Sequence, residues 1–314
     1  MKQNIEIRNM SVQFDTAYGM VHAVRDVNTI FEEGEVTGLI GESGSGKSVL
    51  GMAILQLLAA NAVIQGECLY QGRNLAALSE KEMEKLRGKE IALIPQNPAE
   101  SLNPVIRIRK QLIEAVTIHE PDGKKEAEKR FDDLMKRLGF AEPDVIGRSY
   151  SFQLSGGMNQ RVISALGLMC RPTWIIADEP TKGLDAILRK QVYETLKEMT
   201  VQDTKNMILI THDVALARRL SQKLLVLYRG EILEQGDARD VIEKPRHPYT
   251  QGLIRSLPCN GMVPIDQPKK EREGEENGCV FYPRCHYAME RCCLEHPEEI
   301  TVEGRWKVRC FLYA

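Results

Sequence analysis

The sequence predicts an α/β fold in which a parallel sheet carries its functional residues along one edge. A short apolar strand at residues 36–40 runs into a glycine-rich loop at residues 41–48 and then into an apolar helix. Two further apolar strands, at residues 174–177 and 207–210, each end in polar residues. Polar side chains at the carboxyl ends of apolar strands are typical of a parallel sheet with its site along that edge.

The flanking segments complete this outline. Alternating polar and apolar residues near the N-terminus predict strands, and we expect an antiparallel β portion there. Apolar positions at helical spacing predict a helical subdomain at about residues 85–170, and a fourth apolar strand is expected at residues 224–227. The polar residues 259–278 predict a linker between a main domain at residues 1–258 and a cysteine module at residues 279–314.

The composition excludes two classes of protein. The 314 residues carry 42 Lys and Arg against 44 Asp and Glu, a formal net charge of −2, which argues against nucleic-acid binding by bulk charge. The 27% of charged residues argue against an integral membrane protein. The uncharged run at residues 48–66 is therefore expected to be a buried helix and a turn. The first ten residues lack the apolar core of a secretory signal, so we expect a cytosolic protein.

The glycine-rich loop matches the full phosphate-loop pattern G-x-x-x-x-G-K-[ST] over residues 41–48. Its glycines let backbone amides turn inward around phosphate oxygens, and the helix N-terminus adds favourable partial charge. Lys47 is expected to reach the β- and γ-phosphates, and the Ser48 hydroxyl to bind Mg²⁺. An ordinary glycine turn would rarely have both this strand and this helix beside it. The chain is therefore predicted to bind a nucleotide.

Two adjacent carboxylates follow the apolar strand at residues 174–177. Asp178 is expected to bind Mg²⁺, and Glu179 to polarise the attacking water. A strand end followed by an acidic turn would have the same sequence. The phosphate loop in the same chain favours the catalytic interpretation.

A second helix N-terminus suited to an anion lies at residues 154–161, where Ser-Gly-Gly precedes an expected helix at residues 162–169. One chain with two such helix ends indicates that the second serves a nucleotide held by a partner. Alone, this Ser-Gly-Gly would be interpreted as an ordinary helix cap.

The cysteines are concentrated at the C-terminal end, where residues 279–314 hold five of the eight. In a reducing compartment such a cluster indicates a metal site before it indicates disulfides. The spacing C-x₅-C-x₆-C, with a fourth cysteine further on, counts against zinc, whose ligands usually come in C-x₂₋₄-C pairs. Incidental or structural thiols are the alternative.

Taken together, these motifs resemble those of ABC transporter ATPase subunits over roughly residues 3–258, in the order the family has them. The matching motifs are the Walker A loop at residues 41–48, the Q-loop glutamine Gln96, the signature at residues 154–160, the Walker B pair Asp178 and Glu179, the D-loop at residues 183–185 and the switch histidine His212. The resemblance implies a RecA-like P-loop ATPase core with an N-terminal antiparallel β portion, an inserted helical subdomain and a C-terminal Cys-rich extension.

The resemblance also implies roles for single residues. Those implied for catalysis are Lys47, Gln96, Glu179 and His212, and those implied for Mg²⁺ are Ser48, Gln96 and Asp178. ATP is expected on Tyr18, Gly41, Ser43, Gly44, Ser45, Gly46, Lys47, Ser48 and Val49 of one chain and on Ser155, Gly156, Gly157 and Asp185 of the other. Tyr18 would stack on adenine, with Phe14 as the alternative. Met158 and Lys182 depart from the residues usual at their positions.

Other motifs resemble those of the dipeptide, oligopeptide and nickel importers. They are residues 96–98 with 101–104, residues 247–251 with 257–258, and residues 278–285. In peptide importers the last of these is associated with a [4Fe–4S] cluster, which requires four thiolates. The implied ligands are Cys279, Cys285, Cys292 and Cys310, with the neighbouring Cys293 as an alternative to Cys292 and Zn²⁺ as an alternative metal.

The resemblance thus implies an ATP-hydrolysing subunit that drives uptake of di- and oligopeptides, with a nickel or metal-chelate importer as the alternative. The implied partners are a second ABC ATPase subunit, two membrane permeases and an extracytoplasmic substrate-binding protein, and the implied location is the cytoplasmic face of the inner membrane. A soluble ABC ATPase without a transport role is a more distant alternative. DNA-repair members insert a long coiled coil between phosphate loop and signature, and the sequence there shows no sustained heptads.

Overall fold

The computed structural model describes residues 3–121, 123–257, 261–265 and 278–314, and these form two compact units. Unit 1 comprises residues 1–31, 37–76 and 211–314, and unit 2 comprises residues 32–36 and 77–210. Most of the predicted linker at residues 259–278 lies outside the described residues. The proposed division into a main domain, a linker and a cysteine module therefore stays a prediction.

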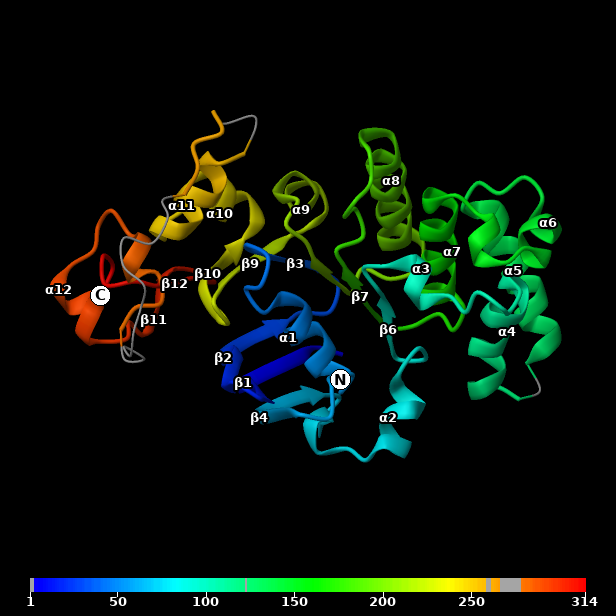
Figure 1. The fold of residues 1–314 in the computed structure, drawn as a ribbon, viewed down its shortest axis with the longest axis horizontal. Helices are drawn as coiled ribbons and strands as arrows, with labels where there is room; N and C mark the ends of the chain where they lie inside the picture. The colour runs from blue at the N-terminus through cyan, green and yellow to red at the C-terminus, as the bar shows by residue number, and fades with distance from the viewer. Residues whose placement is uncertain (1–2, 122, 258–260, 266–277) are drawn as a thin grey trace. The chain divides into compact units, whose positions relative to one another are not determined.

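Unit 1 begins with an antiparallel sheet of four strands in the order β2–β1–β4–β5 (Figure 1). The strands are β1 (Ile5–Thr16), β2 (Gly19–Phe31), β4 (Ala62–Tyr70) and β5 (Arg73–Asn74). The short N-terminal stretches of alternating sequence belong to β1 and β2, two long strands joined by a tight turn at residues 17–18, after which Gly19 begins β2 with a φ of 112°. The predicted antiparallel β portion is confirmed.

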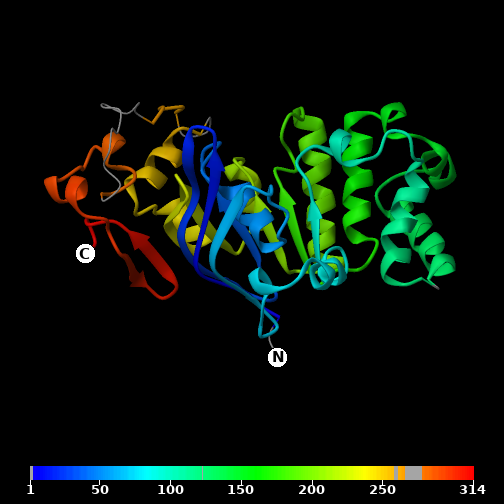
Figure 2. The ribbon, with the colours of Figure 1, turned by 60° about the horizontal axis from the view of Figure 1, so that its bottom comes forward.

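A second group of strands in unit 1 has the order β11–β12–β10–β9–β3. Its members are β3 (Val36–Ile40), β9 (Lys223–Tyr228), β10 (Glu231–Asp237), β11 (Glu299–Glu303) and β12 (Trp306–Arg309). Strands β3 and β9 are parallel, as the buried apolar sequence predicts, and the remaining pairs are antiparallel. Figure 2 shows β11 and β12 as the hairpin, in red, near the C-terminus. The cysteine module thus contributes two strands that the sequence analysis did not predict.

The helices of unit 1 pack against these strands and enclose an apolar core. They are α1 (Lys47–Ile54), α9 (Val214–Leu220), α10 (Ala238–Glu243), α11 (Pro248–Arg255) and α12 (Glu290–Leu294). One core cluster joins Val226 of β9, Val241 of α10 and Tyr249 of α11 to Phe281 and Val308 of the cysteine module. Burial of this apolar surface holds the module to the rest of unit 1.

The uncharged run at residues 48–66 differs from its prediction. The helix α1 ends at Ile54, and β4 begins at Ala62, so the run contains a helix, a turn and the first part of a strand. The strand β4 was missed because Val63 and residues 65–67 are exposed, so it has no continuous apolar run. It is held by pairing with β1, which lies far away in the sequence.

Unit 2 contains three parallel strands in the order β8–β7–β6 together with seven α-helices among the described residues. The strands are β6 (Ile91–Ile94), β7 (Trp174–Asp178) and β8 (Met207–Ile210). The helices are α2 (Glu80–Leu86), α3 (Pro98–Ser101), α4 (Ile108–His119), α5 (Lys124–Arg137), α6 (Pro143–Arg148), α7 (Gly156–Leu168) and α8 (Ala186–Gln202). The predicted strands at residues 174–177 and 207–210 are confirmed.

Two boundaries in unit 2 correct the sequence analysis. The predicted helical region at residues 85–170 includes the strand β6, whose four residues are too few to show a period of their own. The signature helix α7 begins at Gly156, six residues before the predicted start, because Ser155 caps it. Among the described residues, no helix combines the length and the apolar character that crossing a membrane requires.

Candidate functional site

The phosphate loop connects β3 to α1 in unit 1. Strand β3 is buried over its whole length, and helix α1 begins at Lys47. The N-cap residue Gly46 has a left-handed backbone (φ 100°) and, as a glycine, has no side chain to cap the helix. A helix N-terminus of this kind presents its backbone N–H groups to an anion.

The loop needs glycine at two positions for steric reasons. A Cβ at Gly41 would lie 2.1 Å from the carbonyl oxygen of Leu227, and a Cβ at Gly46 would lie 2.2 Å from that of Ala23. At Gly44 (φ 78°), in contrast, a Cβ would meet nothing within 4 Å. The loop is thus packed against backbone on two sides and open at its middle glycine.

These contacts predict that Gly46→Ala destabilises the protein strongly. We expect the free energy of unfolding to fall by about 3 kcal/mol or more, because a left-handed alanine would also clash with a fixed carbonyl. The matched variant Gly34→Ala has a similar φ of 86° in open space, so it should lose only about 1–2 kcal/mol. Chemical denaturation of both variants tests this prediction, and equal losses would contradict it.

Lys47, near the end of the phosphate loop, is buried. Its Nζ donates hydrogen bonds to the backbone carbonyls of Gly41 and Glu42, both at 2.9 Å, and lies 3.5 Å from Ser45 Oγ. The ammonium group therefore sits within the ring of backbone that the predicted phosphates would enter. Of the other predicted loop residues, Ser45 is buried, Ser48 and Val49 are half-buried, and Ser43 and Gly44 are exposed.

A cavity of about 470 Å³ opens beside the exposed part of the loop. Its lining consists of Glu42, Ser43, Gly44, Ser45, Tyr228, Arg229 and Arg284. The last three were missed by the sequence analysis. Arg284 belongs to the cysteine module, 242 positions away from Glu42, and no local pattern marks it as a neighbour of the loop.

The other predicted residues of unit 1 lie at its surface. Tyr18 is fully exposed between β1 and β2, whereas Phe14, the alternative for the adenine contact, is half-buried on β1. His212 is exposed. The preceding residue, Thr211, donates its N–H to the carbonyl of Leu39 at 3.0 Å, so His212 adjoins the end of β3 that leads into the phosphate loop.

The predicted carboxylates of unit 2 lie at the end of β7. Asp178 and Glu179 are 4% and 7% exposed. Glu179 has a φ of 46°, which is uncommon for a residue other than glycine, and its N–H donates to the carbonyl of Ile210 at 2.8 Å. The backbone strain at Glu179 is of a kind often found at functional sites.

Gln96 follows β6, the parallel neighbour of β7, and therefore reaches the same edge of the sheet as Asp178.

The signature residues surround the start of α7 in unit 2. Ser155 accepts a hydrogen bond from the N–H of Met158 at 3.3 Å and so caps the helix. A Cβ at Gly156 would meet nothing within 4 Å, whereas one at Gly157 would lie 2.4 Å from the Leu188 side chain. A cavity of about 310 Å³ is lined by Gln96, Asn97, Pro98, Gly156, Asn159, Gln160, Lys182 and Leu184. The structure therefore brings Gln96, the signature and Lys182 to one cavity.

Asp185 has a local structural role in this chain. Its Oδ1 accepts hydrogen bonds from the N–H groups of Ile187 and Leu188, both at 2.9 Å, and caps α8. The predicted residues are thus divided between the units. The phosphate loop, Tyr18 and His212 lie in unit 1, and the remaining ATP-site residues lie in unit 2.

Four cysteines of the module line one small cavity: Cys279, Cys285, Cys292 and Cys310. Cys293 is not among the residues that line it. Burial raises the pKa of the Cys279 thiol to about 12 and that of Cys285 to about 11. Within the described part of the chain, however, no three or more His, Cys, Asp or Glu side chains are arranged to hold a metal ion. The prediction of a metal centre is therefore not supported beyond the shared cavity.

His247 lines the same cavity and is buried. Its Nδ1 accepts a hydrogen bond from the N–H of Tyr249 at 3.0 Å, which caps α11. Burial lowers the pKa of His247 to about 3, so its ring is neutral at physiological pH. The sequence analysis linked this residue only to the peptide-importer motif.

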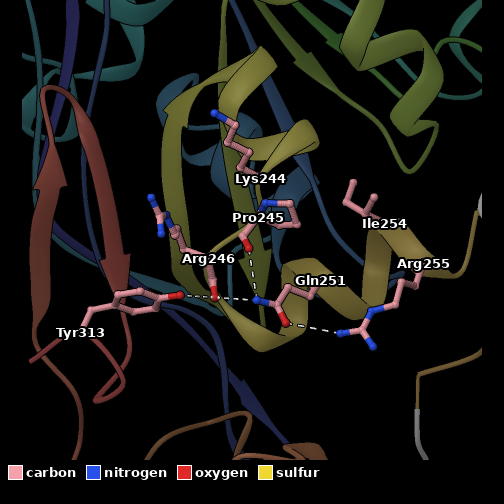
Figure 3. A pocket seen from close by; sticks show the side chains of 7 residues that line it. All are labelled: Lys244, Pro245, Arg246, Gln251, Ile254, Arg255 and Tyr313. Carbon is pink, nitrogen blue, oxygen red and sulfur yellow. Dashed lines mark hydrogen bonds between the residues drawn. The ribbon is translucent and has the colours of Figure 1, made fainter.

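A separate cavity of unit 1 is lined by Lys244, Pro245, Arg246, Gln251, Ile254, Arg255 and Tyr313 (Figure 3). Its polar side chains bond mainly to the lining itself, since Gln251 Nε2 donates to the Pro245 and Arg246 carbonyls and Tyr313 Oη donates to that of Arg246. The sequence analysis assigned no ATP, Mg²⁺ or cluster role to any of these residues. This cavity is not part of the candidate site.

Two protein families match the chain. Residues 24–182 match the family described as ABC transporter, and residues 233–292 match the family described as oligopeptide/dipeptide transporter, C-terminal region. The first match contains the phosphate loop, Gln96, the signature and the Walker B pair. The second contains three of the four cysteines of the small cavity.

The chain is similar to known proteins over almost its whole length. It is 39% identical to the dipeptide transport ATP-binding protein DppD of Escherichia coli (strain K12), with 96% of this chain and 94% of that protein covered. It is 35% identical to the oligopeptide transport ATP-binding protein AppD of Bacillus subtilis (strain 168), with 100% and 98% covered. Among solved structures, the chain is similar to the ATP-binding cassette MJ0796 in a dimeric, post-hydrolysis state bound to ADP and Pi. The TM-score is 0.66 at 26% sequence identity, and the match covers 75% of this chain and 99% of the MJ0796 chain.

Proposed function

Because this chain belongs to the ABC transporter family, we propose that it is the ATP-hydrolysing subunit of an importer for di- and oligopeptides. The observation that carries the proposal is the similarity over almost the whole chain to dipeptide and oligopeptide transport ATP-binding proteins. The match of residues 233–292 to the oligopeptide/dipeptide C-terminal region supports the same cargo. It favours peptides over the alternative cargo, nickel or a metal chelate.

ATP would bind with its phosphates in the phosphate loop. The uncapped start of α1 and the buried Lys47 ammonium supply positive charge there. The residues proposed to contact ATP in this unit are Gly41, Ser43, Gly44, Ser45, Gly46, Lys47, Ser48 and Val49, with Tyr18 on the adenine. The full exposure of Tyr18 supports a stacking role, because an exposed aromatic face is available to a base.

Hydrolysis would use polar residues from the phosphate loop and from the ends of the strands. Ser48, Gln96 and Asp178 would hold Mg²⁺, and their hydroxyl, amide and carboxylate oxygens are the ligand types that this ion prefers. When bound, Mg²⁺ neutralises charge on the phosphates. Glu179 would orient and polarise the attacking water, and His212 would contact the γ-phosphate. The strained backbone of Glu179 supports its role, since backbone strain of this kind is often found at functional sites.

A second ABC ATPase subunit would complete each ATP site. Ser155, Gly156, Gly157 and Asp185 would contact the nucleotide held by that partner. The open space at Gly156 leaves room for a phosphate to approach the start of α7. One similar cassette, MJ0796, was solved as a dimer bound to ADP and Pi.

The remaining partners would be two membrane permeases and an extracytoplasmic substrate-binding protein, with this chain attached peripherally at the cytoplasmic face of the membrane. The test is uptake of a labelled dipeptide into vesicles that contain the permeases, both ATPase subunits and the binding protein. ATP-dependent uptake of the peptide supports the proposal, and uptake of nickel alone contradicts the peptide assignment. ATPase activity that only DNA or ribosomes stimulate would favour a role outside transport.

We further propose that Cys279, Cys285, Cys292 and Cys310 hold a [4Fe–4S] cluster, with Zn²⁺ as the alternative. Four thiol-bearing residues on one small cavity match the ligand number of such a cluster. The raised pKa values of the thiols describe the cavity without a cation, because a bound metal deprotonates its thiol ligands. A bound cluster supplies electron transfer or a structural crosslink.

This assignment predicts different metal contents for two neighbouring variants. Protein purified without oxygen should contain about four iron atoms and four sulfides per chain. Cys292→Ser should lose most of both, whereas Cys293→Ser should keep them, because Cys292 lines the cavity and Cys293 does not. Iron and acid-labile sulfide analysis measures both. Stoichiometric zinc would establish the alternative metal, and equal behaviour of the two variants would contradict the assignment of Cys292.

A further inference from the structure

Glu42, the second residue of the phosphate loop, is held at three points. Its backbone N–H donates to the hydroxyl of Tyr249 at 2.9 Å, and its backbone carbonyl accepts from Lys47 Nζ at 2.9 Å. Its carboxylate forms a two-point ion pair with the guanidinium of Arg284. The sequence analysis gave Glu42 no role, because its position in the loop pattern accepts any residue.

The ion pair has the geometry of a strong contact. Arg284 Nη1 lies 2.9 Å from Glu42 Oε2, and Arg284 Nη2 lies 3.0 Å from Oε1. Parallel hydrogen bonds of this kind fix direction as well as charge. The Arg284 side chain is only 12% exposed, against 38% for Glu42, and this contact with Glu42 raises the pKa of the guanidinium.

Arg284 is placed by the cysteine module and by aromatic rings. It directly precedes Cys285, which lines the thiol cavity, and its Nη1 also donates to the hydroxyl of Tyr228 at 3.3 Å. The ring of Phe281, three residues earlier, packs edge-on against Tyr228 with centroids 5.4 Å apart. The cysteine module therefore places the Arg284 guanidinium beside the phosphate loop, and the packed rings of Tyr228 and Phe281 support it there.

We propose that Arg284 is a positioning residue of the phosphate loop, through which the cysteine module sets the affinity of the loop for ATP. This inference rests on the proposed ATP-binding function. Arg284 neutralises a carboxylate that otherwise faces the incoming phosphates, and it holds Glu42 so that the neighbouring amides keep their orientation. Without it, the unpaired carboxylate repels the phosphates.

The first test compares ATP affinity and turnover in Arg284→Gln. The Kd of the full chain for ATP should rise about 3- to 10-fold, since an unpaired charge replaces a charge-assisted pair. In the assembled transporter, KM for ATP should rise in parallel, whereas kcat at saturating ATP should change less than about twofold, because positioning acts before the chemical step. Arg284→Lys keeps the charge and loses the second hydrogen bond, so its Kd should lie between those of the wild type and Arg284→Gln.

The second test asks whether Arg284 acts through Glu42. In a Glu42→Gln background no carboxylate remains to be neutralised, so adding Arg284→Gln should leave the Kd for ATP unchanged. An equal weakening by Arg284→Gln in both backgrounds overturns the proposal, because it means that Arg284 acts without Glu42. Circular dichroism and denaturation curves of each variant establish that its fold is retained.

A matched control is available in the same module. Arg305, between β11 and β12, pairs with Asp237 at the end of β10, and neither residue lines the phosphate-loop cavity. Arg305→Gln removes one arginine–carboxylate pair and should leave the Kd for ATP at the wild-type value. A rise equal to that of Arg284→Gln overturns the specific role of Arg284.

Thermodynamic linkage supplies an independent readout. If the module affects ATP binding, ATP must affect the module by the same factor. A non-hydrolysable ATP analogue should therefore slow hydrogen exchange in the peptide around Phe281 to Cys285 in the wild type, and this slowing should be absent in Arg284→Gln. A wild-type chain that does not bind ATP overturns the proposed function as well. A wild type that binds ATP, with an Arg284→Gln variant equal to it in Kd and exchange, overturns this inference alone.

Discussion

Glu179→Gln is expected to bind ATP with near wild-type affinity and to lose about 10²- to 10⁴-fold in turnover, the usual contribution of a general base. Glutamine has almost the same shape as glutamate and keeps the hydrogen bond that its backbone N–H donates to Ile210. It lacks the negative charge that polarises water. ATP that binds and is not hydrolysed should hold two subunits together. The variant should therefore accumulate as a closed dimer or heterodimer in the presence of ATP.

Three measurements test this expectation: ATP affinity by titration, kcat by phosphate release, and dimer formation by gel filtration with and without ATP. Glu194→Gln is a suitable control, because it changes a carboxylate on α8 in the same unit, away from the strand end that carries Glu179. Its turnover should equal that of the wild type. Wild-type turnover in Glu179→Gln would remove Glu179 from the catalytic role.

Lys47→Ala should weaken ATP binding about 10- to 100-fold, the usual effect of removing a hydrogen bond to a charged group. The same change removes the hydrogen bonds from Nζ to the carbonyls of Gly41 and Glu42. We therefore also expect the free energy of unfolding of the nucleotide-free chain to fall by about 1–3 kcal/mol. A residue that contacts only the ligand would change ATP affinity alone, whereas Lys47→Ala should lower both ATP affinity and the stability of the nucleotide-free chain.

Titration with ATP and chemical denaturation measure the two effects of Lys47→Ala. Lys190→Ala, which removes an exposed ammonium from α8, should change neither quantity. Unchanged ATP affinity in Lys47→Ala would contradict the assignment of the loop as the phosphate site. Unchanged stability would show that its two hydrogen bonds contribute little without nucleotide.

The strands that the sequence predicted well are those that are buried on both faces. Strands β3 and β8 have the predicted bounds, β7 is one residue longer at its C-terminal end, and β9 is one residue longer at each end. A strand buried on both faces is a continuous apolar run, which is visible in the sequence alone. Of the strands that were missed, β4 and β11 are partly exposed and mix polar with apolar residues, so their pairing depends on distant partners. The missed strands β6, β10 and β12 are largely buried, but β6 has only four residues and the other two include charged residues, so none of them is a long apolar run.

The same distinction applies to the candidate site. The phosphate loop, the signature and the carboxylates after β7 are contiguous stretches, and the chemistry of each needs only neighbouring residues and one helix or strand. The order of residues along the chain is therefore enough to locate each of them. The role of Asp185 as a helix cap could have been inferred as well, since an aspartate before an apolar helical run is a common N-cap.

The sequence by itself therefore determined the fold class, the nucleotide motifs and the presence of a cysteine cluster, because local patterns of polarity and spacing encode all three. Only the tertiary structure decided which cysteines share a cavity and that Arg284 reaches Glu42. These contacts join residues from distant parts of the chain, and no local pattern encodes them. The cysteine module packs against β9 and α11 by burying apolar surface, and this packing brings the distant residues together.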